Sequence, residues 1–87
     1  MNNNKEDLVF KINTKYMNKF INKWVKFPII ANYYTSSIII EASWMKNKDK
    51  IIINKIKKNE YIIKSGGRDG KYLRNKFVWS LLNDYYR

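Results

Sequence analysis

The 87-residue sequence contains neither cysteine nor histidine. A chain of this length forms a single domain, 1–87, and buries only about 60–65% of the surface that its unfolded form exposes. Disulfides and zinc ions often stabilise such small cores, and both need residue types that are missing here. We therefore expect no metal site and no cofactor, and a fold that is stabilised by docking on a larger partner.

The chain carries a large excess of positive charge, with 18 Lys and Arg against seven Asp and Glu and a net charge of +11. Mutual repulsion of these cations opposes compaction, whereas a polyanion would attract them and release its counterions. Lysine has A/T-rich codons, so an AT-rich genome is an alternative source of the many lysines, but it does not explain the scarcity of acids. The charge balance predicts a small basic domain that binds nucleic acid.

The sequence gives no sign of a membrane span or a cleaved leader. No stretch approaches the roughly 18 apolar residues that a span requires. The first seven residues lack the apolar core of a secretory signal and the Arg and Ser of a transit peptide. We expect the protein to act where it is made, in the mitochondrial matrix or another organelle, with the cytoplasm of a virus-infected or AT-rich cell as the alternative.

Residues 6–27 have the periodicity of an amphipathic helix, which Pro28 would end. The apolar face would hold Val9, Phe10, Tyr16, Met17, Phe20, Ile21, Trp24 and Phe27. The opposite side would form a secondary basic face of Lys11, Lys15, Lys19, Lys23 and Lys26. Leu8 and Ile12 depart from the pattern and fall toward the lysines. This basic face is either simply solvated or lies against an anion, for which we favour RNA over a membrane surface.

Residues 29–63 are rich in Ile and Tyr and favour strands, with a turn at 47–50. The isoleucines of 51–63 could equally line one side of a helix, because short apolar runs do not distinguish the two. We favour strands.

Ser65, Gly66 and Gly67 interrupt this pattern, and Asp69 with Gly70 gives a second turn signal. Residues 71–86 predict a final helix that is apolar around most of its circumference and needs contacts on several sides. The fold class is therefore expected to be α+β: a small single domain with an N-terminal amphipathic helix, an irregular or stranded middle and a C-terminal apolar helix.

Catalysis is not expected. Without His or Cys the chain cannot form the usual nucleophile systems, and its carboxylates show no spacing for paired acid–base or metal-assisted chemistry. The segment 66–71 lacks the spacing of a P-loop, and no Ser or Thr follows its Lys. We expect no enzyme activity and no small-molecule substrate.

Basic residues are densest between positions 55 and 76, interleaved with aromatics. Gly66 and Gly67 would let the backbone approach a phosphate, with which Arg68 could pair, while Tyr72 and Phe77 would pack in the core. Tyr61 would stay free to stack on an unpaired base. The predicted RNA-binding residues are Lys55, Lys57, Lys58, Tyr61, Lys64, Arg68, Lys71, Arg74 and Lys76. The alternative is a solvated basic loop whose aromatics belong to the core.

The basic segment 55–61 followed by 65–80, with its glycine, arginine, aromatic, phenylalanine and serine positions, resembles the family of small-ribosomal-subunit protein number fourteen in its zinc-free organellar and bacterial form. The resemblance covers residues 54–87 and implies that Arg68, Lys71, Arg74 and Lys76 contact ribosomal RNA in the head of the small subunit. The family's cysteine position is Tyr61 or Glu60 here, and the arginine expected after the serine is Leu81. Residues 68–73 also resemble a stretch of small-subunit protein number sixteen.

The sequence as a whole predicts a non-catalytic RNA-binding protein, a structural component of a ribosomal small subunit that contacts structured RNA and neighbouring proteins in a large assembly. Two alternatives remain. One is a small viral or phage protein that binds nucleic acid or inhibits a host nucleoprotein complex. The other is an accessory subunit of an organellar membrane complex.

Overall fold

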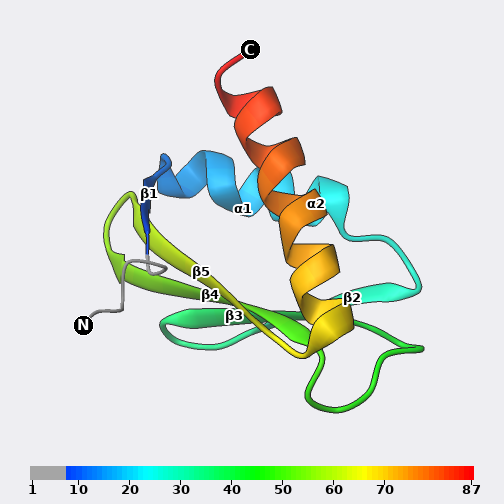
Figure 1. Cartoon of the computed structure of the whole chain (residues 1–87). Coiled ribbons are helices and arrows are strands. Elements are labelled where there is room, and N and C mark those ends of the chain that lie inside the picture. The colour runs from blue at the N-terminus through cyan, green and yellow to red at the C-terminus, as the bar shows by residue number, and fades with distance from the viewer. Residues whose placement is uncertain (1–7) are drawn as a thin grey trace.

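The computed structural model describes residues 8–87 as an antiparallel sheet with two helices (Figure 1). The elements, in chain order, are β1 (Val9–Lys11), α1 (Thr14–Trp24), β2 (Ile29–Tyr33), β3 (Ser37–Ala42), β4 (Lys50–Lys57), β5 (Glu60–Gly66) and α2 (Arg68–Tyr85). The expected α+β class is confirmed. The expected order is wrong in one respect, since a strand precedes the first helix.

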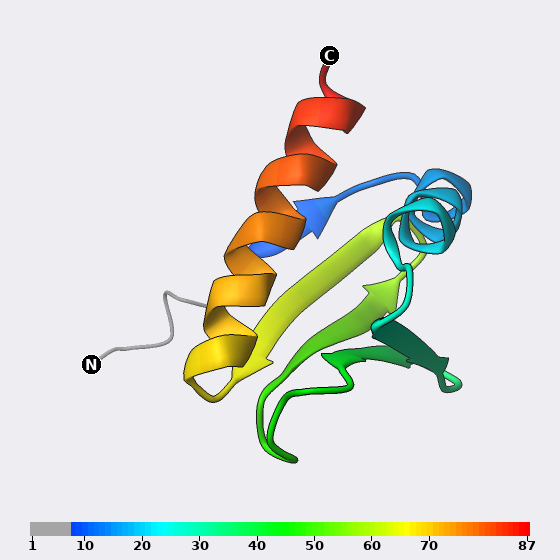
Figure 2. The same cartoon turned by 90° about the vertical axis from the view of Figure 1, so that its right-hand side faces the viewer.

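The five strands form one sheet in the order β1-β5-β4-β3-β2, and every neighbouring pair is antiparallel. Strands β2 to β5 follow one another as hairpins, whereas β1 crosses to the far edge and pairs with β5, Val9 opposite Ile62. Figure 2 shows both helices on the same face of the sheet. The molecule therefore has two layers, with the core between them.

The core is built from alternate residues of the strands, because successive side chains of a strand point to opposite faces. On the helix-facing side the buried side chains are Ile40, Ile51, Ile53, Tyr61 and Ile63, which pack with Met17, Phe20 and Ile21 of α1 and with Leu73, Phe77 and Leu81 of α2. Ile39, Ile52 and Ile62 project from the other face, which no element within residues 8–87 covers (Figure 2).

The first helix begins at Thr14, so the expectation of a helix over 6–27 is wrong at its start. Val9 to Lys11 pair with the edge of β5, which satisfies backbone groups that a helix would have satisfied internally. Asn13 then begins α1 as its N-cap, since its Oδ1 accepts a hydrogen bond of 2.9 Å from the Tyr16 amide. Ile12, which did not fit the helical pattern, is buried in the core. Glu6 and Asp7, the first two residues of the predicted helix, lie outside the described residues.

The middle of the chain consists of strands, as favoured, and the helical alternative for 51–63 is wrong. The predicted turn at 47–50 is present, with β4 starting at Lys50. The final helix starts at Arg68 rather than Lys71, so Asp69 and Gly70 belong to its first turn and do not form a separate one. No helix within residues 8–87 has both the length and the apolar character that crossing a membrane would require.

Candidate nucleic-acid interface

Most positive charges of the described residues have no acidic partner. Of the 18 Lys and Arg, 17 lie within residues 8–87, all but Lys5, and three of these 17 form ion pairs there. The pairs are Lys57 with Glu60 at 3.8 Å, Lys23 with Asp84 at 3.9 Å and Arg87 with Asp84 at 3.7 Å. The other 14 cations pair with no acid in this part of the chain. Their distribution over the surface therefore decides where an anion would bind.

The fold brings two groups of basic residues together at the start of α2. A Cβ atom at Gly70 would lie 2.5 Å from the backbone nitrogen of Lys50, so only glycine lets the β3–β4 loop approach the helix this closely. Lys50 and Lys64 lie at this end of the sheet and project from the face of Ile52, which the helices leave uncovered, because Lys64 pairs with Ile52 and Gly66 with Lys50. We call the resulting surface the basic end; it comprises Lys46, Lys48, Lys50, Lys64, Arg68 and Lys71.

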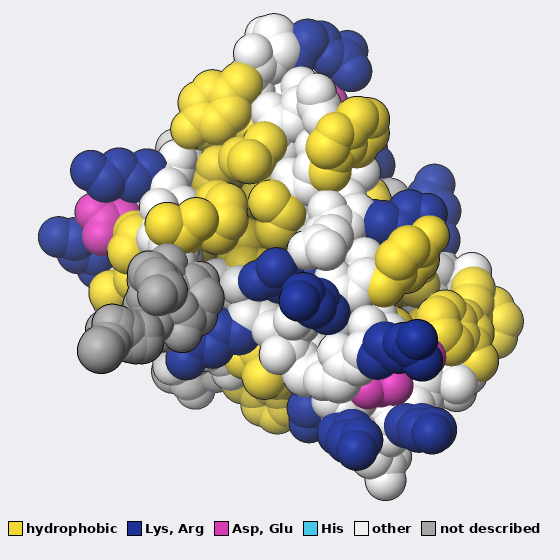
Figure 3. Space-filling view, in the orientation of Figure 1, with side chains coloured by type: hydrophobic (Ala, Val, Ile, Leu, Met, Phe, Trp, Pro, Cys, Tyr) yellow, Lys and Arg dark blue, Asp and Glu magenta, His cyan; other side chains and the backbone are white. Residues whose placement is uncertain are grey.

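Figure 3 shows Lys and Arg side chains gathered over the start of α2 and the neighbouring loop. All members of the basic end are exposed except Lys50, which is half-buried. The two nearby acids are withdrawn from the solvent, since Asp69 is half-buried and Asp49 is only 5% exposed. The outward-facing charge at this end is therefore almost entirely positive.

Asp49 takes the place that the sequence suggested for a phosphate. Its Oδ1 lies directly beside Gly67, where a Cβ atom would overlap it, and the carbonyl oxygen of Lys48 lies beside Gly66. A carboxylate near a helix N-terminus is stabilised by the helix dipole. The glycines thus accommodate the protein's own β3–β4 loop, and the surrounding cations, not the glycine backbone, are the groups that remain available to an anion.

The predicted cluster between positions 55 and 76 is divided by the fold. Lys57 and Lys58 lie at the β4–β5 turn, the opposite end of β4 from Lys50, about 20 Å away at the rise of a strand. Lys64, Arg68 and Lys71 form part of the basic end. These residues therefore do not make one continuous contact surface.

Two further predicted cations lie on α2. Lys76 is exposed, with its Nζ 5.5 Å from the centre of the Tyr72 ring. Arg74 is half-buried beside Leu8 and Trp79, and its Nε has no hydrogen-bond partner among residues 8–87. Arg74 is therefore partly committed to packing, while Lys76 is accessible.

The aromatic residues are placed differently from the expectation. Tyr61 is 2% exposed, so no base can stack on its ring, and Tyr72, expected in the core, is 63% exposed. Phe77 is buried as expected. The exposed aromatics that the sequence reading missed are Tyr72 and Trp79 of α2 and Tyr86, the C-cap of that helix. Their spacing of seven residues, close to two helical turns, places them on one side of α2 and could have identified them.

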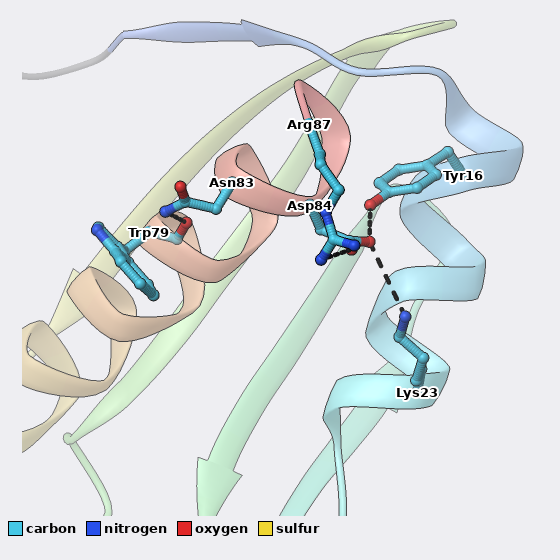
Figure 4. Close-up of polar contacts among 6 residues, drawn as sticks. All are labelled: Tyr16, Lys23, Trp79, Asn83, Asp84 and Arg87. Carbon is cyan, nitrogen blue, oxygen red and sulfur yellow. Dashed lines mark hydrogen bonds and ion pairs between the residues drawn. The ribbon is translucent and has the colours of Figure 1, made fainter.

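The secondary basic face is shorter than predicted. Lys11 belongs to β1 and Lys26 follows the end of α1, which leaves Lys15, Lys19 and Lys23 on the helix, all exposed. Lys23 is also engaged with Asp84 of α2 (Figure 4). This face is therefore a weaker candidate for an anion than the basic end.

Asp84 joins the two helices through a polar cluster (Figure 4). The Tyr16 hydroxyl donates a hydrogen bond to the Asp84 carboxylate, which also contacts Lys23 and Arg87. Burial, together with this hydrogen bond and the nearby negative charge, raises the pKa of Tyr16 to about 12. The Tyr16 hydrogen bond and the two cations lower the pKa of Asp84. The cluster connects α1 to α2 and accounts for two of the three ion pairs found within residues 8–87.

Within residues 8–87 no three acidic side chains come together as a metal site would require. No protein-family model matches the chain, and no curated protein or solved structure gives a significant match.

Proposed function

We propose that this protein is a non-catalytic RNA-binding protein that uses its basic end to hold structured RNA. The observation that carries the proposal is the convergence of Lys46, Lys48 and Lys50 with Lys64, Arg68 and Lys71, none of which pairs with an acid of residues 8–87. Six like charges at one end repel one another in the free protein. A phosphate backbone would offset that repulsion and gain from the release of its counterions.

Binding of this kind positions a protein without reading a base sequence, since phosphate contacts carry no sequence information. The flexible lysines can follow an irregular backbone, and Arg68 can hold two oxygens of one phosphate. The exposed aromatics Tyr72 and Trp79 lie on the helix that begins at the basic end, and the exposed Tyr86 is its C-cap. RNA with unpaired bases could contact the cations of such a surface through its phosphates and the aromatic rings through its bases.

We place this activity in a large assembly, as a structural component of a ribosomal small subunit of an organelle or an AT-rich genome. The resemblance of residues 54–87 to small-subunit protein number fourteen supports that setting. So does a groove of about 580 Å³ beside α2, whose apolar lining includes Leu8, Phe10 and Trp79. Trp79 is 70% exposed and Leu8 is 66% exposed, as expected of side chains that a neighbouring protein would cover.

The proposal is tested by two triple variants of equal charge. One replaces Lys64, Arg68 and Lys71 by Ala. The control replaces Lys15, Lys19 and Lys26, which are also exposed and also form no ion pair within the described chain. Binding to an RNA hairpin is measured as a function of salt concentration. The first variant should lower the slope of log K against log salt by about 2–3, since each lost phosphate contact lowers it by about 0.7–0.9.

The control should keep nearly the wild-type slope. Equal losses in both variants would contradict a localised interface and would leave only general attraction between opposite charges. Equally strong binding to anionic vesicles would favour the membrane alternative. Comigration of the protein with small ribosomal subunits on a density gradient tests the ribosomal setting separately from RNA binding.

A further inference from the structure

The longest stretch of the chain without a positive charge forms the β2–β3 hairpin. Residues 27–45 contain no Lys or Arg, and Glu41 is their only charged residue. All 18 Lys and Arg lie outside this stretch. The hairpin is at one side of the sheet, with β2 as the edge strand (Figure 2). This segment therefore offers no cation of its own to an RNA phosphate.

The same segment exposes large apolar side chains. Phe27, which precedes β2, is 85% exposed, and the others that are exposed are Ile30, Tyr33, Tyr34 and Trp44. Surfaces that contact other proteins are depleted in lysine and enriched in aromatic residues, compared with the rest of a protein surface. Composition and exposure together mark the hairpin as a surface for contact with a protein.

The tip of the hairpin is fixed in the free protein. The Tyr34 amide donates to the Ser37 carbonyl at 2.8 Å, and the Lys55 amide donates to the Ser36 carbonyl at 2.9 Å. Lys55, one of the predicted RNA-binding residues, is exposed here on β4 and does not belong to the basic end. Because its tip is fixed, the hairpin orders few groups when another chain binds to it.

The outer edge of β2 presents backbone groups that no strand of residues 8–87 takes up. In an antiparallel pair, every second residue bonds to the neighbouring strand. The Pro28 carbonyl and the Tyr34 amide bond across the hairpin, so the even-numbered residues of β2 bond to β3. The backbone groups of Ile29, Ala31 and Tyr33 therefore point away from the sheet.

β2 lacks the features that keep many edge strands from pairing. Protected edges are very short, are bulged, or carry lysine or proline. β2 has five residues, its register with β3 is uninterrupted, and it contains neither of these residue types. The opposite edge strand, β1, has only three residues and ends in Lys11. Of the two edges, β2 is the one that is open to a further strand.

We propose that two copies of this chain associate by antiparallel pairing of their β2 strands about a two-fold axis at Ala31. The two sheets then form one continuous sheet. Ala31 lies opposite Ala31 of the second copy, and Tyr33 lies opposite Ile29 of the second copy. The Ala31 and Tyr33 amides donate to the Ala31 and Ile29 carbonyls across the axis, while the Ile29 amide stays bonded to the Lys26 carbonyl at 2.7 Å.

The side chains fit this register. Tyr33 with Ile29 is an aromatic–β-branched pair, one of the stabilising combinations between neighbouring strands, and the small Ala31 occupies the axis. Phe27 precedes the strand and Tyr34 follows it, so these two exposed rings of opposite copies come to the same end of the contact. No charged residue lies in β2. The strand is complementary to itself, which makes a second copy the partner that it fits.

The distribution of charge also favours this edge. Two chains of net charge +11 repel each other, and the repulsion is weakest where the contacting segment carries no cation. The dimer should therefore become stronger as salt is added, whereas salt weakens binding to RNA. The proposal does not depend on RNA binding.

The test measures self-association of the full chain by sedimentation velocity after nuclease treatment. The variant Ile30→Lys and the control Val9→Lys each replace an aliphatic residue of an edge strand, 45% and 47% exposed. Ile30→Lys should weaken the dimer at least about 10-fold, because two isoleucines lose their cover and two like charges come together near the axis. Val9→Lys adds the same charge and should dimerise like the wild type.

Single cysteines test the register, since the natural chain has none. Ala31→Cys places two Cα atoms about 5.5 Å apart across the axis, within reach of a disulfide. Tyr33→Cys, on the same strand, places them about 14 Å apart. Oxidised glutathione should therefore give a covalent dimer with Ala31→Cys and none with Tyr33→Cys.

A wild-type protein that stays monomeric at about 1 mM would overturn the proposal, because even a weak dimer forms at that concentration. Dimerisation that Ile30→Lys leaves intact, or that Val9→Lys abolishes instead, would also overturn it. So would association that disappears with nuclease treatment, since RNA would then hold the copies together. If Ile30→Lys does not fold, the cysteine variants decide, and equal cross-linking at both positions contradicts the pairing of β2.

Discussion

Gly67 is the residue whose backbone leaves least room for substitution. Its φ of 77° and ψ of 170° lie in a region that is nearly restricted to glycine, and a Cβ atom there would overlap Asp49 Oδ1. This conformation turns the chain from β5 into α2 within one residue. The position of the basic end therefore depends on a residue that contributes no charge.

Gly67→Ala is expected to lower the free energy of unfolding by roughly 1–3 kcal/mol, measured by urea denaturation, because of the strained backbone. The double variant Gly67→Ala with Asp49→Ala removes the overlap but not the strain, so it should fall between the single variant and the Asp49→Ala control. A single variant as stable as the wild type would show that the turn has another conformation.

The exposure of single aromatic residues could not be predicted from the sequence. Tyr61, Ile62 and Ile63 form a continuous apolar run, so no alternation shows which of them faces the core. Which of these side chains face the core is set by pairing with distant strands, since Tyr61 lies between Lys55 of β4 and Phe10 of β1. The sequence therefore did not show that the Tyr61 ring is buried in the core.

At the scale of elements, the contact between the two helices depends on a few polar groups near their ends. Tyr16 and Lys23 of α1 meet Asp84 in the last turns of α2 (Figure 4), and the Tyr16 and Tyr85 rings lie 4.7 Å apart. Below this cluster the contact is apolar, with Phe20 and Trp24 against Phe77. Because the pKa values of Tyr16 and Asp84 are shifted in this cluster, the contact between the helices should depend on pH.

Stability should decrease between about pH 10 and pH 12 through Tyr16. Its pKa is raised from 10.0 to about 12 in the folded protein, so the folded state holds the proton more tightly than the unfolded state. This contribution is complete below pH 10 and is lost as the pH rises through 12. Urea midpoints measured across this range should decline less steeply in Tyr16→Phe than in the wild type. Parallel declines would exclude Tyr16 as the cause.

The sequence predicted most elements but not their arrangement. Isoleucine and tyrosine content favoured the strands of 29–63. Helical periodicity found the second helix within three residues at each end, but it started the first helix eight residues too early. β1 was not predicted, because three residues carry little local preference for a strand and because the partner strand β5 lies about fifty positions away in the sequence. The only local sign was that Leu8 and Ile12 did not fit the apolar face of a helix. The approach of residues 46–50 to α2 was equally non-local, so the basic end could not be assembled from spacing alone.

At the scale of the whole molecule, charge repulsion acts across the entire fold. The chain carries a net charge of +11, and its principal dimensions are 37 × 31 × 27 Å. At an ionic strength of 0.01 M the Debye length is about 30 Å, so nearly all the cations interact, whereas at 0.15 M it is about 8 Å. The free protein should therefore be sensitive to salt in a way that a neutral domain is not.

The midpoint of thermal unfolding should rise as NaCl is increased from 10 to 150 mM, because screening weakens the repulsion in the compact state more than in the extended chain. Sucrose at matched osmolality serves as the control for effects that do not depend on charge. A midpoint that is constant or falls over this range would show that the excess charge does not destabilise the free protein.

The position of β1 at the edge next to β5 has a consequence for how the polypeptide is made. Val9 leaves the site of translation long before Ile62, its partner, has been added. Until β5 has been added the edge of β4 has no neighbour, and until α2 has been added α1 has no second helix to pack against. Because β5 and α2 are the last two elements in the sequence, the sheet and the core can be completed only after nearly all of the strands and both helices have been synthesised.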